Sequence, residues 1–172
     1  MLDPLLDVLL KPESWATRLL LEECRTLTPE QFRQPLGLGL GNIEQTITHV
    51  VGSMIFFTDR LNRTPPRPRP DHDPQPITPE ALLTLFDQAD RELRQAIITA
   101  LETHEMTDIL NWTDDDTGEI HPLDQITYAV ALAQMIDHSL HHRTEALDML
   151  RLLGINKPMS WHPFEWDEAM RR

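Results

Sequence analysis

The sequence predicts an all-α protein in which four long helices are joined by two long connections. Two observations lead to this prediction. Apolar residues recur every three or four positions along four segments, and no segment shows the apolar–polar alternation expected of strands. The chain has 172 residues, 40% of them hydrophobic, which suits one globular unit with a substantial core. We therefore expect residues 1–172 to form a single domain.

The first predicted helix covers residues 4–27, with an interruption expected at Pro12, where a new helix can begin. Cys24 lies in line with Leu20 and Leu27 at helical spacing, so it is interpreted as a packed core thiol and not as a nucleophile. As the only cysteine of the chain, it excludes an intrachain disulfide.

A short helical segment and a second long helix follow. Thr28 is a good N-cap, Pro29 suits the first helical position, and Gln31 completes a capping box. The second long helix is expected over residues 43–62, capped by Asn42. Its apolar stripe is formed by Ile43, Ile47, Val50, Met54, Phe57 and Leu61.

Residues 62–79 contain seven prolines and cannot form a regular helix or a central strand. We interpret them as a stiff, extended surface connection in preference to a proline-rich ligand for another protein. The third helix is expected to begin after the cap residue Thr78 and to reach residue 103.

A second long connection covers residues 104–121, and the fourth helix is predicted from Pro122 to Leu153, with Gly154 as its stop. Between residues 126 and 136 this helix is apolar on almost every side. Such a helix is either central to its domain or part of a subunit interface, so a homodimer is one expectation.

Charge and hydropathy argue against nucleic acid and membrane partners. The formal net charge is −13, whereas a nucleic-acid-binding protein needs a basic surface. No apolar run approaches the roughly 20 residues of a membrane span. Residues 1–14 lack the basic start and cleavage site of a secretory signal, which favours a cytoplasmic location.

Three histidines, His138, His141 and His142, fall within five positions of the predicted fourth helix. Residues four apart in a helix are displaced by only about 40°, so His138 and His142 share one face. Two histidines at this spacing can supply two nitrogen ligands to one divalent ion. The alternative is a partly exposed helix end whose histidines are satisfied by water or by neighbouring carboxylates.

His49 is the best candidate for a third ligand, because it lies about 120° from the apolar stripe of its helix and is not a routine core position. Gly52 and Ser53 on the same side are small and would leave space for a ligand or substrate. Glu145 could orient an imidazole from behind the metal site, or could be an ordinary exposed glutamate.

Three stretches of the chain resemble the DinB-like family. LTPEQFRQPLGLGLGNIEQTITHVV is similar to its first loop and second helix, HSLHHRTEALDMLRLLG to its late-helix HxxxHR signature, and LLDVLLKPESWATRLLLEECRTL to its first helix. The resemblance covers nearly the full length. Two features depart from the family pattern: Thr144-Glu145 stand where Gly-Gln is frequent, and the connection 62–79, expected near one end of the bundle, is unusually long.

The resemblance implies a four-helix bundle in up-down-down-up order, usually dimeric, with one divalent metal held by His49, His138 and His142. Family members have been associated with nickel, zinc, iron or manganese. Those of known activity include bacillithiol- and mycothiol-dependent transferases and isomerases. The resemblance thus implies a small-molecule substrate, with a thiol as one candidate. The implied chemistry is low-molecular-weight thiol transfer or hydrolysis.

Two other functional classes stay open at this stage: a non-catalytic dimeric helical bundle and a metal-binding module without turnover. The sequence does not separate Glu145, Gln45 and a metal-bound water as general bases. It also leaves open whether Trp112, Trp161 and Trp166 line a pocket, form a dimer contact or pack in the core.

Overall fold

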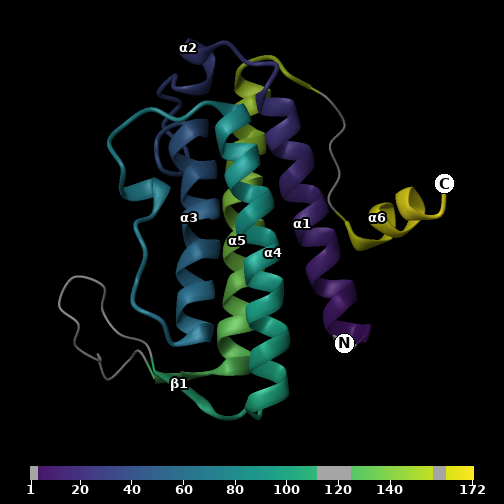
Figure 1. Ribbon diagram of the computed structural model, residues 1–172. Coiled ribbons are helices and arrows are strands. Elements are labelled where there is room, and N and C mark those ends of the chain that lie inside the picture. Colours follow the sequence, from purple (N-terminus) through teal and green to yellow (C-terminus); the bar gives the residue numbers. More distant parts are fainter. Residues whose placement is uncertain (1–3, 112–124, 157–161) are drawn as a thin grey trace.

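The computed structural model describes residues 4–111, 125–156 and 162–172. Four long helices lie side by side and form the body of the protein (Figure 1). The helices of the described chain are α1 (Pro4–Cys24), α2 (Pro29–Phe32), α3 (Ile43–Asn62), the 3-10 helix η1 (Pro70–His72), α4 (Pro79–Thr103), α5 (Tyr128–Leu152) and α6 (Pro163–Met170). The all-α prediction is therefore confirmed.

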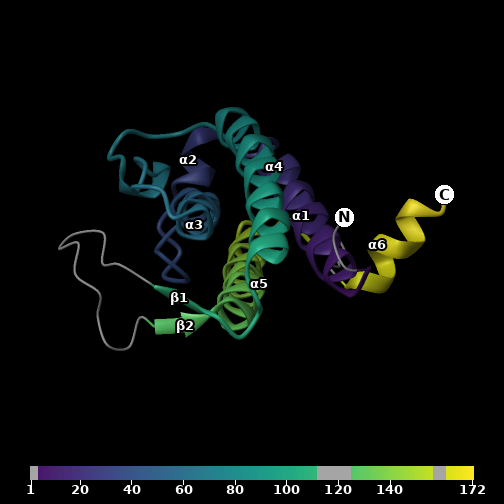
Figure 2. The same ribbon diagram turned by 60° about the horizontal axis from the view of Figure 1, so that its bottom comes forward.

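The directions of the long helices follow the up-down-down-up order. α1 and α5 run one way along the bundle, whereas α3 and α4 run the other way (Figures 1 and 2). α3 packs against both α4 and α5, and α1 packs against the same two helices. α1 and α3 thus lie on one diagonal of the bundle, and α4 and α5 lie on the other.

The core consists of two apolar clusters stacked along the bundle. One is at the end near α2 and includes Leu21, Ile47, Phe86, Ala146 and Met149. The other is at the opposite end and includes Phe57, Ile97, Leu110, Tyr128 and Met135. Both draw on the predicted apolar stripes, because burying those stripes against one another removes the most apolar surface from water.

The first helix differs from its prediction, because α1 continues through Pro12 without interruption and ends at Cys24. A proline inside a helix removes one backbone hydrogen bond, but packing of α1 against α4 and α5 offsets this cost. Cys24 is fully buried, and burial raises the pKa of its thiol, so its interpretation as a core residue agrees with the structure.

The prediction for the start of the fourth helix was wrong. Residues 125–127 form the strand β2 (Gln125–Thr127), which pairs with β1 (Ile109–Asn111) in an antiparallel ladder. Thr127 ends this strand and caps α5, since its side chain accepts a hydrogen bond from Val130 N. The β-branched pair Ile126-Thr127 suits a strand, which explains why helical periodicity alone misplaced this boundary.

The connection between α3 and α4 does not lie at one end of the bundle, as expected, but runs along the outer side of α3 (Figure 1). The reason is topological. α3 has 20 residues and is about 30 Å long, and the chain has to return over that length to start a second helix in the same direction. We call residues 63–78 the return strut; at about 3.1 Å per residue, extended proline-rich chain covers such a distance readily.

A buried arginine joins α5 to α1. Arg143 is almost completely buried and pairs with Glu13, and its Nη1 also donates to Thr17 Oγ1 at 3.2 Å and to Ser139 Oγ at 2.8 Å. A buried charge is tolerated only when it is paired and hydrogen-bonded, so this contact fixes the register of the two helices.

The C-terminal helix α6 was not predicted; it lies beside α1, and His162 is its N-cap (Figure 2). Trp166 is half-buried on this helix, whereas Trp112 and Trp161 lie outside the described residues. Among the described residues, no helix is long and apolar enough to cross a membrane.

Candidate metal centre

Three histidines from two helices converge on one point. His49 comes from α3, and His138 and His142 come from successive turns of α5. Each offers a ring nitrogen such that the three ligand atoms lie within 4.8 Å of one another, and the Nε2 atoms of His49 and His138 are 3.1 Å apart. The structure thus brings together all three residues predicted as ligands.

The separation of these nitrogens fits a metal ion. With metal–nitrogen bonds of about 2.0–2.1 Å, tetrahedral geometry places two ligand nitrogens about 3.3 Å apart. The His49–His138 distance is close to this value. The site is also partly shielded from water, since the side chains of His49 and His142 are 27% and 11% exposed. Neutral imidazoles in a half-buried pocket suit a divalent transition metal.

Two of the three imidazoles are held from behind by carboxylates. His142 Nδ1 lies 2.7 Å from Glu145 Oε2, and His49 Nδ1 lies 2.9 Å from Asp71 Oδ2. An ionised carboxylate only accepts hydrogen bonds, so both Nδ1 atoms carry the proton and donate it. Each corresponding Nε2 then keeps a lone pair for a metal, which is the usual arrangement around metal-binding histidines.

Glu145 therefore lies where it can orient the imidazole of His142, which is one of the two roles predicted for it. It follows His142 by three residues, so one turn of α5 brings the two side chains together. The loop before α3 closes over it at Gly39, which has a positive φ of 50°. A Cβ atom added to Gly39 would lie 2.9 Å from Glu145 Oε2, so only glycine permits this close approach.

Asp71 is the residue that sequence reasoning missed. It lies in η1 on the return strut, 22 positions after His49, and no helical spacing connects the two. Its carboxylate occupies the space beside Gly52, where an added Cβ would lie only 1.9 Å from Asp71 Oδ1. The expectation that Gly52 leaves room for a substrate was therefore wrong, because the space belongs to Asp71.

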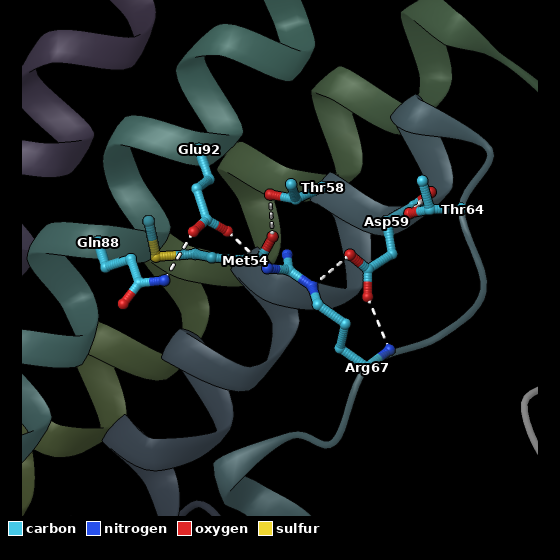
Figure 3. Close-up of polar contacts among 7 residues, drawn as sticks. All are labelled: Met54, Thr58, Asp59, Thr64, Arg67, Gln88 and Glu92. Carbon is cyan, nitrogen blue, oxygen red and sulfur yellow. Dashed lines mark hydrogen bonds and ion pairs between the residues drawn. The ribbon is translucent and has the colours of Figure 1, made fainter.

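The return strut is anchored where it leaves α3 (Figure 3). The buried Asp59 accepts hydrogen bonds from Arg67 N at 2.9 Å and Arg67 Nε at 2.7 Å. Arg67 Nη1 in turn donates to Glu92 Oε2 on α4 at 2.7 Å, and Gln88 donates to the other oxygen of Glu92. These bonds attach the strut to both helices four residues before Asp71.

His141 points away from the three-histidine cluster, as its helical position predicts. Its side chain is 64% exposed, and its Nε2 lies 3.2 Å from Glu145 Oε1. His141, His142 and Glu145 form a second group of possible ligands. All three belong to one turn of α5, and Glu145 already binds His142 Nδ1, so we assign the candidate centre to the cluster that joins two helices.

Burial lowers the pKa of His138 to about 4, and the neighbouring His142 and His49 act in the same direction. Burial also lowers the pKa of His142, against the opposing hydrogen bond to Glu145. Burial raises the pKa of Asp71, but the hydrogen bond to His49 and the charge of Arg69 outweigh it, so this pKa is below its usual value. His138 and His142 are thus neutral and Asp71 is charged near pH 7.

Two further polar side chains, Gln45 and His104, lie outside the histidine cluster. Gln45 is exposed one turn before His49. His104 ends α4 and packs its ring against Tyr128. Neither belongs to the cluster of possible ligands.

Comparison with known proteins shows to which family the chain belongs. The model of the DinB family matches residues 1–169. The chain belongs to this family. No curated protein matches it. Its histidine cluster can therefore be read as that of a DinB-family protein, in which Asp71 and Glu145 are the carboxylates of this particular chain.

Replacing Gly52 with alanine should weaken metal binding without unfolding the protein. The new Cβ would displace Asp71 from His49, and losing such an orienting partner typically costs about 10- to 100-fold in metal affinity. Alanine favours a helix over glycine, so α3 should persist. Zinc titration of Gly52→Ala, Asp71→Asn and the control Asp73→Asn tests this. Equal affinity of Asp71→Asn and Asp73→Asn would contradict the role of Asp71.

The metal-free protein should lose stability as the pH falls from about 6.5 to about 4. His138 has a folded-state pKa of about 4 against an ordinary value of 6.5, so the unfolded chain binds more protons in this window. Urea unfolding between pH 7 and pH 5 measures the effect, and His138→Gln, which cannot titrate, should show a shallower dependence. An identical pH dependence of both proteins would refute this assignment.

Proposed function

We propose that this DinB-family protein is a divalent-metal-dependent enzyme whose ion is held by His49, His138 and His142. The observation that carries the proposal is the pair of carboxylate contacts behind the histidines. Asp71 and Glu145 each accept a hydrogen bond from an Nδ1–H group, so the Nε2 atoms of His49 and His142 keep their lone pairs for a metal. Histidines that were merely solvated would need no such matched pair.

A divalent ion with three imidazole ligands and an open position would polarise a bound substrate and lower the pKa of a water or thiol. The protein's own residues fix where this happens. α3 and α5 hold the three imidazoles, and the return strut and the loop at Gly39 hold the two carboxylates in place. The donor set accepts nickel, zinc, iron or manganese, and availability often decides among them.

The chemistry that we propose is transfer of a low-molecular-weight thiol, or hydrolysis, on a small-molecule substrate. Glu145 is occupied by His142 and His141 through its two oxygens, so it acts as a positioning residue. The alternatives are a metal-binding module without turnover and a non-catalytic dimeric bundle. A module would bind the metal but leave no position for a thiol, and the bundle would bind no metal.

Metal affinity of two single variants separates these functions. His138→Ala should lose more affinity than the about 10- to 100-fold typical of removing an orienting partner, because it removes a ligand. His141→Ala, one turn away and exposed, should retain it. Equal affinities of the two variants would show that the ligand assignment is wrong.

Thiol access is measured on the cobalt(II)-loaded protein. If the centre keeps an open position, adding a small thiol should produce a sulfur-to-cobalt charge-transfer absorption. A cobalt spectrum that does not change with thiol would favour the metal-binding module.

The homodimer is a further part of the proposal. The outward side of α5 carries apolar side chains, with Val130 51% and Leu140 44% exposed. A second copy of this chain would remove them from water. Light scattering tests the assembly, since one chain has a mass of 19.9 kDa. A cytoplasmic location and the absence of nucleic acid and membrane partners stay predictions.

A further inference from the structure

The bundle contains a pocket that ends at the histidine cluster. It lies among α1, α3, α4 and α5 and has His138 on its wall. Its interior offers about 60 Å³ of space that water could occupy. One water needs about 10–15 Å³ by this measure, so the pocket has room for a short alkyl chain and not for a large ligand. His138 therefore connects this pocket with the proposed metal centre.

The wall of the pocket is mainly apolar. All four helices contribute to it, and its apolar side chains include Val50, Met54, Phe57, Leu93, Ile97 and Met135. These residues belong to or pack against the predicted core stripes, yet they leave space between them. An apolar cavity of this kind favours an apolar occupant, because water inside it finds few hydrogen-bonding partners.

The charged residues on the wall are already paired with other protein groups. Arg94 Nε donates to Asp90 at 3.0 Å, and its Nη2 donates to the carbonyl of Leu10 at 3.1 Å. Glu13 is paired with the buried Arg143. Among the described wall residues, no carboxylate or guanidinium is therefore left to neutralise a ligand, and a charged ligand would be desolvated without compensation.

The wall also offers neutral polar groups. The hydroxyls of Ser14 and Ser53 face this space without a hydrogen-bond partner among the described residues. They could accept or donate a hydrogen bond to a hydroxyl or carbonyl of a ligand. The pocket thus combines apolar contact with weak, uncharged polar recognition.

We propose that this pocket binds the apolar, uncharged body of a small molecule, whose reactive group lies at the His138 end. The position of the reactive group rests on the metal-dependent function proposed above, whereas binding of the apolar body does not. The substrate class is therefore a small apolar molecule, such as an alkyl thiol, and not a multiply charged metabolite.

Binding of the apolar body is tested on the metal-free protein by titration calorimetry with 1-hexanol, heptanoate and hexylammonium, which share one hexyl chain and differ only in their head groups. Hexanol should bind at least about tenfold tighter than either ion. It should also bind about 15-fold tighter than 1-butanol, since each of the two additional methylenes contributes about fourfold. Absence of hexanol binding, or equal binding of the ions, would overturn the proposal.

A matched pair of variants locates the binding site. Ser14→Phe should fill the pocket and reduce hexanol affinity at least about tenfold. Thr99→Phe adds the same ring on the exposed side of α4 and should leave hexanol affinity unchanged. Equal affinity of the two folded variants would place hexanol elsewhere and contradict the proposal. If Ser14→Phe does not fold, the head-group and chain-length series on the wild type decides.

The zinc-loaded protein tests the orientation of the ligand. There 1-hexanethiol should bind more than about tenfold tighter than 1-hexanol, because its sulfur reaches the ion. His142→Ala should abolish this difference while keeping hexanol binding, since His142 is not on the wall. Zinc binding without hexanol binding would refute the proposed ligand binding in the pocket and leave the metal-dependent function standing. Hexanol binding without zinc binding would refute the metal-dependent function and leave the apolar site standing.

Discussion

Because α3 and α4 run in the same direction, the chain has to travel back along the whole length of α3 between them. An antiparallel pair could be joined by a short turn, but a parallel pair needs a long connection. The return strut meets this need with extended, proline-rich chain. Its path along α3 carries Asp71 to the side of His49, so the topology of the bundle supplies the orienting carboxylate of the candidate metal centre.

α5 combines two roles on adjacent residues. His142 faces α3 and the other histidines, whereas Arg143, about 100° further around the helix, is buried against α1. The ion pair with Glu13 therefore holds α5 from one side, while the other side of α5 presents two of the candidate ligand histidines. The pocket lies between these two contacts, bounded by His138 and by the Ser139 that Arg143 binds.

Much of this architecture was predictable from local patterns. The helix stripes, the caps at Thr28 and Asn42, and the one-turn spacing of His138 and His142 are properties of single helices, which sequence periodicity reports directly. Glu145 could be named as an orienting residue for the same reason. His49 was predicted as the third candidate ligand because it lies off the apolar stripe of its helix, and it lies beside His138 and His142.

The parts that could not be predicted depend on contacts between distant segments. Asp71 stands in a stretch without periodicity, and nothing in the sequence links it with Gly52 or His49. The one available signal was a glycine in the middle of an otherwise strong helix, which indicates a close approach by another group. The start of α5 was misplaced because the pairing of β2 with β1, a tertiary contact, outweighed the continuation of the helical pattern.

The central claim is that α3 and α5 share one metal ion. Metal content per chain, measured by plasma mass spectrometry on protein prepared without a histidine tag, tests it most directly when wild type and His49→Ala are compared. The account predicts nearly one divalent ion per wild-type chain and almost none in His49→Ala, although both histidines of α5 remain. A His49→Ala protein that retains its metal would contradict it, as would a wild type that takes up none of zinc, nickel, iron or manganese.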